Sequence, residues 1–212
     1  NICFLTEEYP NVNDFGGIGF HFSQLVAGLS TSGHQLTVIY NGDKAFSSPN
    51  VEVIPVSSLL GTVGRKIYRF FFETELGTVL CWSVLAVILA RRLDRQHRFE
   101  VIETHDYHCV PWWLLLGKER LVFTLQGGKK QTAELNQEFR KLSHQILFFL
   151  EKLTLDHAVH LYASSPVQKL AAMQMYQTNI ETCIPNAVDT SFFHPASKAS
   201  PRKTEFILFA GR

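Results

Sequence analysis

The stretch from Asn1 to Tyr40 decides the fold, and it reads NICFLTEEYPNVNDFGGIGFHFSQLVAGLSTSGHQLTVIY. Residues 2–6 form an apolar run that predicts a buried strand. A loop rich in turn-forming residues follows and ends at the run Gly16-Gly17-Ile18-Gly19. Behind the glycines, apolar residues recur at the spacing of one helix face. These residues are Ile18, Phe22, Leu25, Val26 and Leu29.

The chain then turns into a second strand. Gly33 follows the helix where a C-terminal glycine cap belongs. Residues 35–40 have the composition of a strand. Strand, glycine loop, helix and strand make a βαβ unit, whose crossover is expected to be right-handed.

The glycine loop allows two interpretations. Glycines let the backbone approach a ligand closely, and the first amides of the helix point outward beside roughly half a positive charge of the helix dipole. A phosphate group is the ligand that such a site typically binds. Alternatively, the glycines only form the turn and let helix pack on strand, because a lone glycine loop is a weak signal.

The composition restricts the class of protein. The chain of 212 residues is 46% hydrophobic and 18% charged, so it can bury a substantial core. The formal net charge of +1 argues against a protein that binds nucleic acid. The cysteines lack the spacing of metal ligands, so we expect reduced thiols, a cytoplasmic protein and no metal site. They are Cys3, Cys81, Cys109 and Cys183.

Strands alternate with helices along the rest of the chain. A turn is expected at 47–50, and a cap at Ser165-Pro166 begins a helix over 167–175. This alternation is typical of an α/β fold with a doubly wound, mostly parallel, Rossmann-like sheet. The further strands are expected at residues 51–56, 99–104, 121–125, 158–163 and 181–184.

The segment from Leu76 to Ala90 is apolar throughout but shorter than the about 20 residues that span a bilayer. We expect a long helix buried against the sheet. The alternative is a helix in a membrane interface, which would give the protein a peripheral membrane contact. Basic residues that could then meet lipid headgroups are Arg65, Lys66, Arg69, Arg91 and Arg92.

Three polar or glycine-rich loops follow predicted strands. They comprise residues 7–19, 105–108 and 126–130. Because ligands of doubly wound sheets bind beyond the carboxyl ends of the strands, we expect these loops to converge on one crevice.

Several segments resemble retaining glycosyltransferases of family 4, whose two-Rossmann-domain fold is called GT-B. The resemblance covers nearly the whole chain, and its last two segments are the most specific. The segments are Gly16–Gly19, Leu25–Leu29, Gly33–Val38, Phe99–Asp106, Ile184–Thr190 with Phe193 and Pro195, and Ile207–Arg212.

The resemblance implies a division of the chain. Residues 1–196 would be the N-terminal acceptor-binding domain, and residues 197–204 a linker. Residues 205–212 would be the first strand of a truncated C-terminal domain that binds the nucleotide sugar. The chain is therefore expected to be a fragment that shows no sugar transfer by itself.

The resemblance also implies the substrates, which are a nucleotide-sugar donor and a sugar or lipid-linked acceptor, without a bound cofactor. Gly16 and Gly17 would face the donor diphosphate, and Arg212 would contact it from the other side. Fixed amides and an arginine can stabilise the leaving diphosphate by about 3 kcal/mol per well-placed donor.

One departure from the family pattern concerns the catalytic position. Gln126 stands where many relatives carry a histidine after the fifth strand. Glutamine can hydrogen-bond a sugar but cannot titrate near neutral pH. Gln126 is thus one catalytic candidate, and His105 or His108 could supply the missing histidine. The second departure is Ala187, where glycine is usual.

Other polar residues are candidates for acceptor binding. Glu7 lies in the loop expected to face the acceptor. Asp106 could orient an acceptor hydroxyl or merely form a turn. Lys129 and Lys130 could receive an anionic acceptor or a lipid phosphate, or be solvated loop residues. Glu151 is expected on a helix as a surface or capping group.

Three other classes of protein compete with the transferase interpretation. A sugar-nucleotide epimerase shares the architecture but needs a carboxylate base over the sugar ring. A dehydrogenase is disfavoured because Phe22 stands where a third glycine belongs and no acid ends the second strand, which runs into Tyr40-Asn41-Gly42. A non-catalytic carbohydrate-binding subunit stays open.

Overall fold

The computed structural model describes residues 1–10, 16–61, 74–106, 117–136, 141–180, 182–188 and 190, with only the backbone of Lys118 and Leu135. Several expectations lie outside these residues. They are the linker at 197–204, the strand at 205–212, and the roles of Arg212 and His108.

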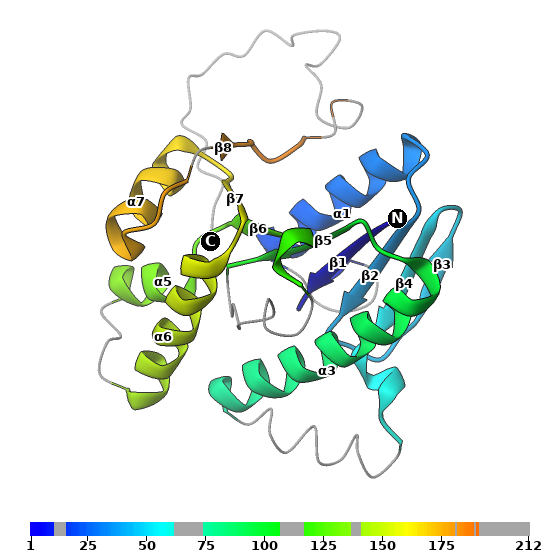
Figure 1. Ribbon diagram of the computed structural model, residues 1–212, viewed down its shortest axis with the longest axis horizontal. Helices are drawn as coiled ribbons and strands as arrows, with labels where there is room; N and C mark the ends of the chain where they lie inside the picture. The colour runs from blue at the N-terminus through cyan, green and yellow to red at the C-terminus, as the bar shows by residue number, and fades with distance from the viewer. Residues whose placement is uncertain are drawn as a thin grey trace, which may run out of the picture.

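The molecule is built on one eight-stranded sheet with the strand order β3-β4-β2-β1-β5-β6-β7-β8 (Figure 1). Neighbouring strands are parallel except β3, which runs antiparallel to β4. The strands are β1 (Ile2–Thr6), β2 (Leu36–Tyr40), β3 (Phe46–Ser48), β4 (Val51–Pro55), β5 (Val101–His105), β6 (Leu121–Leu125), β7 (His160–Ala163) and β8 (Thr182–Cys183).

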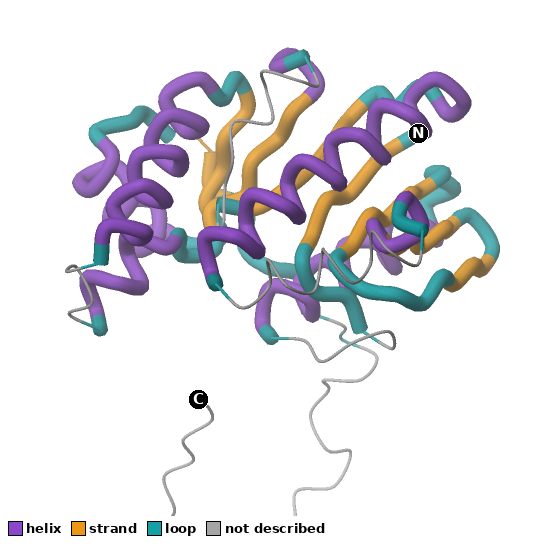
Figure 2. The backbone as a smooth tube through the Cα atoms, turned by 90° about the horizontal axis from the view of Figure 1, so that it is seen from below, coloured by secondary structure: helices purple, strands orange, loops and turns teal. Residues whose placement is uncertain are grey.

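Helices connect the parallel strands and cover both faces of the sheet. Figure 2 shows the long helix α3 laid across the strands. Single turns of 3₁₀ helix lie at Val56–Leu59 and Lys118–Arg120. The α-helices are α1 (Gly17–Thr31), α3 (Glu75–His97), α5 (Lys129–Leu135), α6 (Leu142–His157) and α7 (Pro166–Tyr176).

The predicted α/β class and the mostly parallel, doubly wound sheet are confirmed. The caps behave as expected. Gly33 takes a φ of +87° just after α1, and the Ser165 hydroxyl accepts a hydrogen bond from the Gln168 amide at 3.1 Å at the start of α7. The turn expected at 47–50 is wrong in part, because Ser47 and Ser48 pair with β4. All three residues of β3 are exposed, so no apolar alternation marks that strand.

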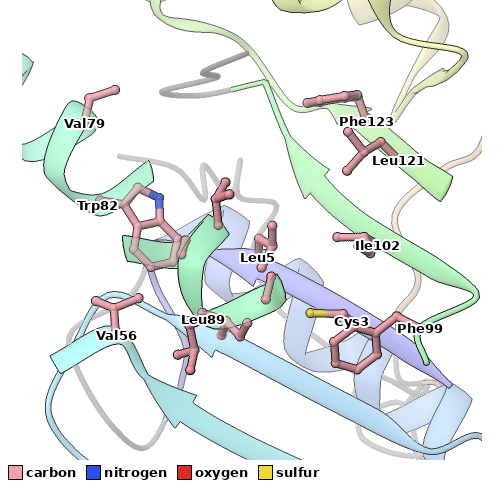
Figure 3. Close-up of a cluster of buried hydrophobic side chains, with 14 of the residues drawn as sticks. Cys3, Leu5, Val56, Val79, Trp82, Leu89, Phe99, Ile102, Leu121 and Phe123 are labelled. Atoms are coloured by element: carbon pink, nitrogen blue, oxygen red, sulfur yellow. The ribbon is translucent and has the colours of Figure 1, made fainter. Parts of the chain in front are cut away.

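Two hydrophobic clusters lie on the two faces of the sheet, because alternate residues of a strand point to opposite faces. Phe4 of β1 packs with Phe22 of α1 on one face. Leu5 of β1 packs with Trp82 and Leu89 of α3 on the other face, as Figure 3 shows. The expected helix over 76–90 is thus part of α3, and the prediction that it is buried against the sheet is confirmed for this side of the helix.

By length and composition alone, α3 could cross a membrane, but its inner side belongs to the core. The described cysteines, Cys3, Cys81 and Cys183, are free thiols, as predicted.

The topology fixes where a ligand should bind. The chain leaves β1 toward β2 on one side, whereas β5 pairs with β1 on the other side. In doubly wound sheets the crevice beyond the carboxyl ends of two such strands holds the ligand. This edge of the sheet carries the end of β1, the start of α1 and the end of β5.

Candidate functional site

The first part of the site is the start of α1. Gly16 has an extended backbone at the N-cap, and no side chain caps this helix. The Gly16 amide donates to the Glu8 carboxylate, and the Phe20 amide begins the helical ladder by donating to the Gly16 carbonyl at 3.1 Å. The amides of Gly17 and Ile18 donate to no described residue. Within the described part of the chain, no acceptor therefore competes with an anion for these two amides.

A cavity of about 190 Å³ opens at this helix start. It joins the glycine loop to the end of β5, as expected from the order of the strands. A methyl group added at Gly17 would meet nothing within 4 Å, so the backbone here is open to a ligand. The lining residues are Glu7, Glu8, Gly16, Gly17, Ile18 and His105.

His105 is buried beside Phe22, and the two ring centroids lie 5.7 Å apart. It is the last residue of β5 and lines the cavity. Gln126 does not line this cavity. Its side-chain amide exchanges two hydrogen bonds with the side-chain amide of Asn186, at 3.2 and 3.3 Å. The two catalytic candidates therefore lie in different surroundings, and their roles stay predictions.

Two larger hollows, of about 260 and 490 Å³, lie elsewhere. The first is lined by the amino ends of β1, β2 and β4, and the second by those of β6, β7 and β8. Because ligands of parallel sheets bind at the carboxyl ends, these hollows are on the wrong edge of the sheet.

Asp106 holds the loop after β6. Its side chain is 1% exposed. One carboxylate oxygen accepts the Gln126 amide at 2.8 Å, and the other accepts the Gly127 amide at 3.2 Å. Burial raises the pKa of Asp106 to about 6, although these amide hydrogen bonds oppose the rise. Both oxygens thus serve the loop backbone, and contact with an acceptor stays a prediction.

Glu151 of α6 holds the next part of the same loop. Glu151 is 1% exposed, and its carboxylate accepts hydrogen bonds from the amides of Lys129 at 2.8 Å and Lys130 at 3.1 Å. These are the first two residues of α5, so Glu151 caps that helix. Burial and the nearby Asp106 raise the pKa of Glu151 to about 7. The capping role is confirmed, and the surface alternative is wrong.

The two lysines begin α5, so the interpretation as solvated loop residues is wrong. Lys129 is buried, and its Nζ lies 2.6 Å from a carboxylate oxygen of Glu75 at the start of α3. Lys130 donates to the Met175 carbonyl at 3.1 Å and lies over the ring of Tyr176. Their engagement with an acceptor stays a prediction, and it would compete with these contacts.

The part of the chain that the structure describes contains no cluster of side chains that could hold a metal ion. Those residues bring no three His, Cys, Asp or Glu side chains together.

Comparison with known families settles the membership of the chain. The model of Glycosyltransferase Family 4 matches residues 15–192. The chain belongs to glycosyltransferase family 4. A search of curated proteins finds no match.

Solved structures agree with this family 4 fold. Sucrose-phosphate synthase from Thermosynechococcus elongatus superposes with a TM-score of 0.63 at 16% identity, over 92% of this chain and 50% of that one. The catalytic domain of starch synthase IV from Arabidopsis thaliana, bound to ADP and acarbose, gives 0.53 at 15% identity, over 97% and 55%. The family 4 chain spans about half the length of these proteins and has the N-terminal, Rossmann-like half of their GT-B fold.

Sequence reasoning missed a buried carboxylate in β5, two residues before His105 of the candidate site. Glu103 of β5 accepts hydrogen bonds from Thr124 of β6, at 2.7 Å, and from Tyr162 of β7. Burial raises the pKa of Glu103. The signal in the sequence is an acid in the middle of an apolar strand, because a buried acid needs hydrogen-bond partners. This network ties β5 and β6, which carry two of the three site loops, to the neighbouring strand β7.

The two loop-holding carboxylates predict a pH dependence of stability. Their pKa values lie above the ordinary 3.8 of Asp106 and 4.5 of Glu151, so the folded protein holds these protons more tightly than the unfolded chain. The resulting stabilisation is complete below about pH 4 and is lost as pH rises to about 7, with an upper value of about 3 kcal/mol per group.

Urea unfolding of the family 4 protein and of Glu151→Gln at several pH values checks this prediction. The wild type should lose about 2 kcal/mol more than the variant between pH 5 and pH 8. Asp156→Asn is the matched control, because Asp156 is an exposed acid of the same helix, paired with Lys152. Parallel pH curves for wild type and Glu151→Gln would contradict the assigned protonation.

Proposed function

We propose that this chain is the acceptor half of a retaining glycosyltransferase, which moves a sugar from a nucleotide sugar to a sugar or lipid-linked acceptor. The observation that carries the proposal is the pair of open amides at Gly17 and Ile18, beside a cavity that includes His105. This cavity lies at the switch point of the sheet, between β1 and β5.

The proposed chemistry follows from the charge that develops in the transition state. As the bond between the sugar and the diphosphate breaks, negative charge grows on the leaving diphosphate. The amides at the start of α1 are fixed by the helix and can stabilise that charge by about 3 kcal/mol per donor. A second domain would supply the nucleotide site, and the ADP in the starch synthase IV structure is a molecule of the proposed class.

Within this proposal, His105 is the better placed of the two catalytic candidates. It lines the cavity, whereas the Gln126 side chain is engaged with Asn186. We place Gln126 at the margin of the site, where its amide pair joins the loop after β6 to the segment after β8. The protein would act in the cytoplasm on substrates without a bound cofactor.

The experiment uses the full-length protein, a set of nucleotide sugars and simple sugar acceptors, with products analysed by proton NMR. The proposal expects transfer, and a product whose anomeric configuration equals that of the donor. An inverted product would contradict the retaining mechanism. Binding of free sugars without transfer would favour the second candidate, a carbohydrate-binding subunit, which the non-titrating Gln126 keeps open.

Gly17→Val tests the role of the helix start. The added side chain meets no protein atom within 4 Å at its Cβ, but it would occupy the space in front of the amides. We expect kcat/KM to fall about 100-fold while Tm stays unchanged, in keeping with the loss of one well-placed donor. Gly61→Val is the matched control, because its Cβ is also uncrowded and Gly61 lies outside the cavity. Equal activity of the two variants would remove the helix start from the site.

A further inference from the structure

We propose that the outer surface of α3 and α6 docks on an anionic lipid surface. The two helices pack side by side on one face of the sheet, because Trp82 of α3 and Leu147 of α6 belong to one core cluster. Their opposite sides carry large apolar side chains that the described residues leave exposed. This α3–α6 apolar surface consists of Leu80, Val84, Ile88, Leu142, Ile146 and Phe149.

The spacing of these side chains shows two continuous stripes. Leu80, Val84 and Ile88 follow one another at intervals of four residues, and every exposed residue of α3 between Leu76 and Ala90 belongs to this stripe. On α6, Leu142 and Phe149 are 73% and 66% exposed. No Asp, Glu, Lys or Arg lies in residues 76–90 or 142–150. A soluble surface helix normally carries charges on this side.

The charges around the α3–α6 apolar surface indicate which partner binds there. Each acid of the two helices is buried or neutralised within the protein: Glu75 pairs with Lys129, Asp94 with Arg120, and Asp156 with Lys152, while Glu151 is buried. The basic residues at the two ends of the stripes form no ion pair with the described residues. They are Arg91, Arg92 and Arg95 on α3, and Lys141 before α6.

An apolar strip flanked by uncompensated basic residues matches a membrane whose headgroups are anionic. A second copy of the chain fits less well, since a two-fold interface places the same surface on both sides and would bring like charges together. The helices would lie in the interface rather than span it, because their inner sides are part of the protein core.

Docking in this way would also place the cavity near the lipid. α3 begins at Glu75, whose carboxylate contacts Lys129 directly after the Gln126 loop, and His144 at the start of α6 at 3.3 Å. The helices therefore start at the site edge of the sheet. Resting on the proposed function, this arrangement favours a lipid-linked acceptor over a soluble one.

Sedimentation of the full-length protein with vesicles tests the proposal without any need for sugar transfer. We expect binding to vesicles of phosphatidylcholine with phosphatidylglycerol, weaker binding in high salt, and little binding to phosphatidylcholine alone. Replacing Arg91, Arg92 and Arg95 by glutamine should weaken binding about fivefold per arginine. The triple variant Val84→Ser, Ile88→Gln, Phe149→Ser should weaken it at least about tenfold.

The matched control is Lys44→Gln with Phe46→Ser, which removes one exposed basic and one exposed apolar side chain at the β3 edge. It should bind vesicles like the wild type, and circular dichroism melting checks that all variants fold. Three results would each overturn the proposal. They are no vesicle binding by the wild type, binding by the Val84→Ser, Ile88→Gln, Phe149→Ser variant that equals the wild type, and a dimer that this variant abolishes. Because vesicle binding is measured without a donor, its failure is distinguishable from failure of the transferase assignment.

Discussion

Gly128→Ala is expected to lower the free energy of unfolding by about 3 kcal/mol or more. The new Cβ would overlap the Glu151 carboxylate, lying 2.8 Å from its Cδ and 2.9 Å from the Tyr176 hydroxyl. Glu151 is buried and caps α5 through two amides, so it cannot move aside without leaving those amides unsatisfied.

Gly28→Ala is the matched control for this experiment. Gly28 lies inside α1, and a Cβ there would meet nothing within 4 Å. This change should stabilise the protein by about 0.5–1 kcal/mol, because alanine loses less backbone entropy than glycine on folding. Urea unfolding measures both variants. Similar stabilities for the two alanine variants would show that the packing of Glu151 against Gly128 is not as described.

Asp106→Ala is expected to cost about 3 kcal/mol of unfolding free energy. It leaves the partly buried amides of Gln126 and Gly127 without their acceptors, and each such amide costs about 1–3 kcal/mol. Part of this loss is offset because the variant no longer buries a carboxylate. The raised pKa of Asp106 shows that burial of its charged form is unfavourable.

Asp106→Asn keeps one carbonyl oxygen and should lose about half as much stability. Thermal melts and urea curves of both variants provide the measurement. Hydrogen exchange then shows whether the amides at 126 and 127 become the first to exchange, as a local loss of the loop requires. A destabilisation equal in both variants, or unchanged exchange at these amides, would contradict the assigned role.

The fold was predictable from the sequence because its signals are local and repeated. Apolar runs such as residues 2–6 and 121–125 mark buried parallel strands, and the helical spacing after Gly17 marks α1. The short strand β3 was not predictable, since its pairing with β4 depends on a two-residue turn at Pro49-Asn50 rather than on an apolar face.

The candidate site was predictable only in outline. The strand-end rule correctly joined the glycine loop to His105, because it follows from topology. It was wrong in placing the loop at 126–130 in the same crevice, since none of those residues lines the cavity. It could not foresee that Asp106 would serve the loop backbone or that Glu151 would reach the start of α5. These contacts, and the Gln126–Asn186 pair, join residues about 20 to 60 positions apart, where no local periodicity exists.

The central claim is that the start of α1 receives the diphosphate of a sugar nucleotide at the β1–β5 switch point. A crystal structure of the full-length protein with a nucleoside diphosphate bound tests it most directly. We predict phosphate oxygens within hydrogen-bonding distance of the Gly17 amide, with His105 lining the same cavity. A diphosphate bound elsewhere, with the Gly17 and Ile18 amides facing only solvent, would contradict it.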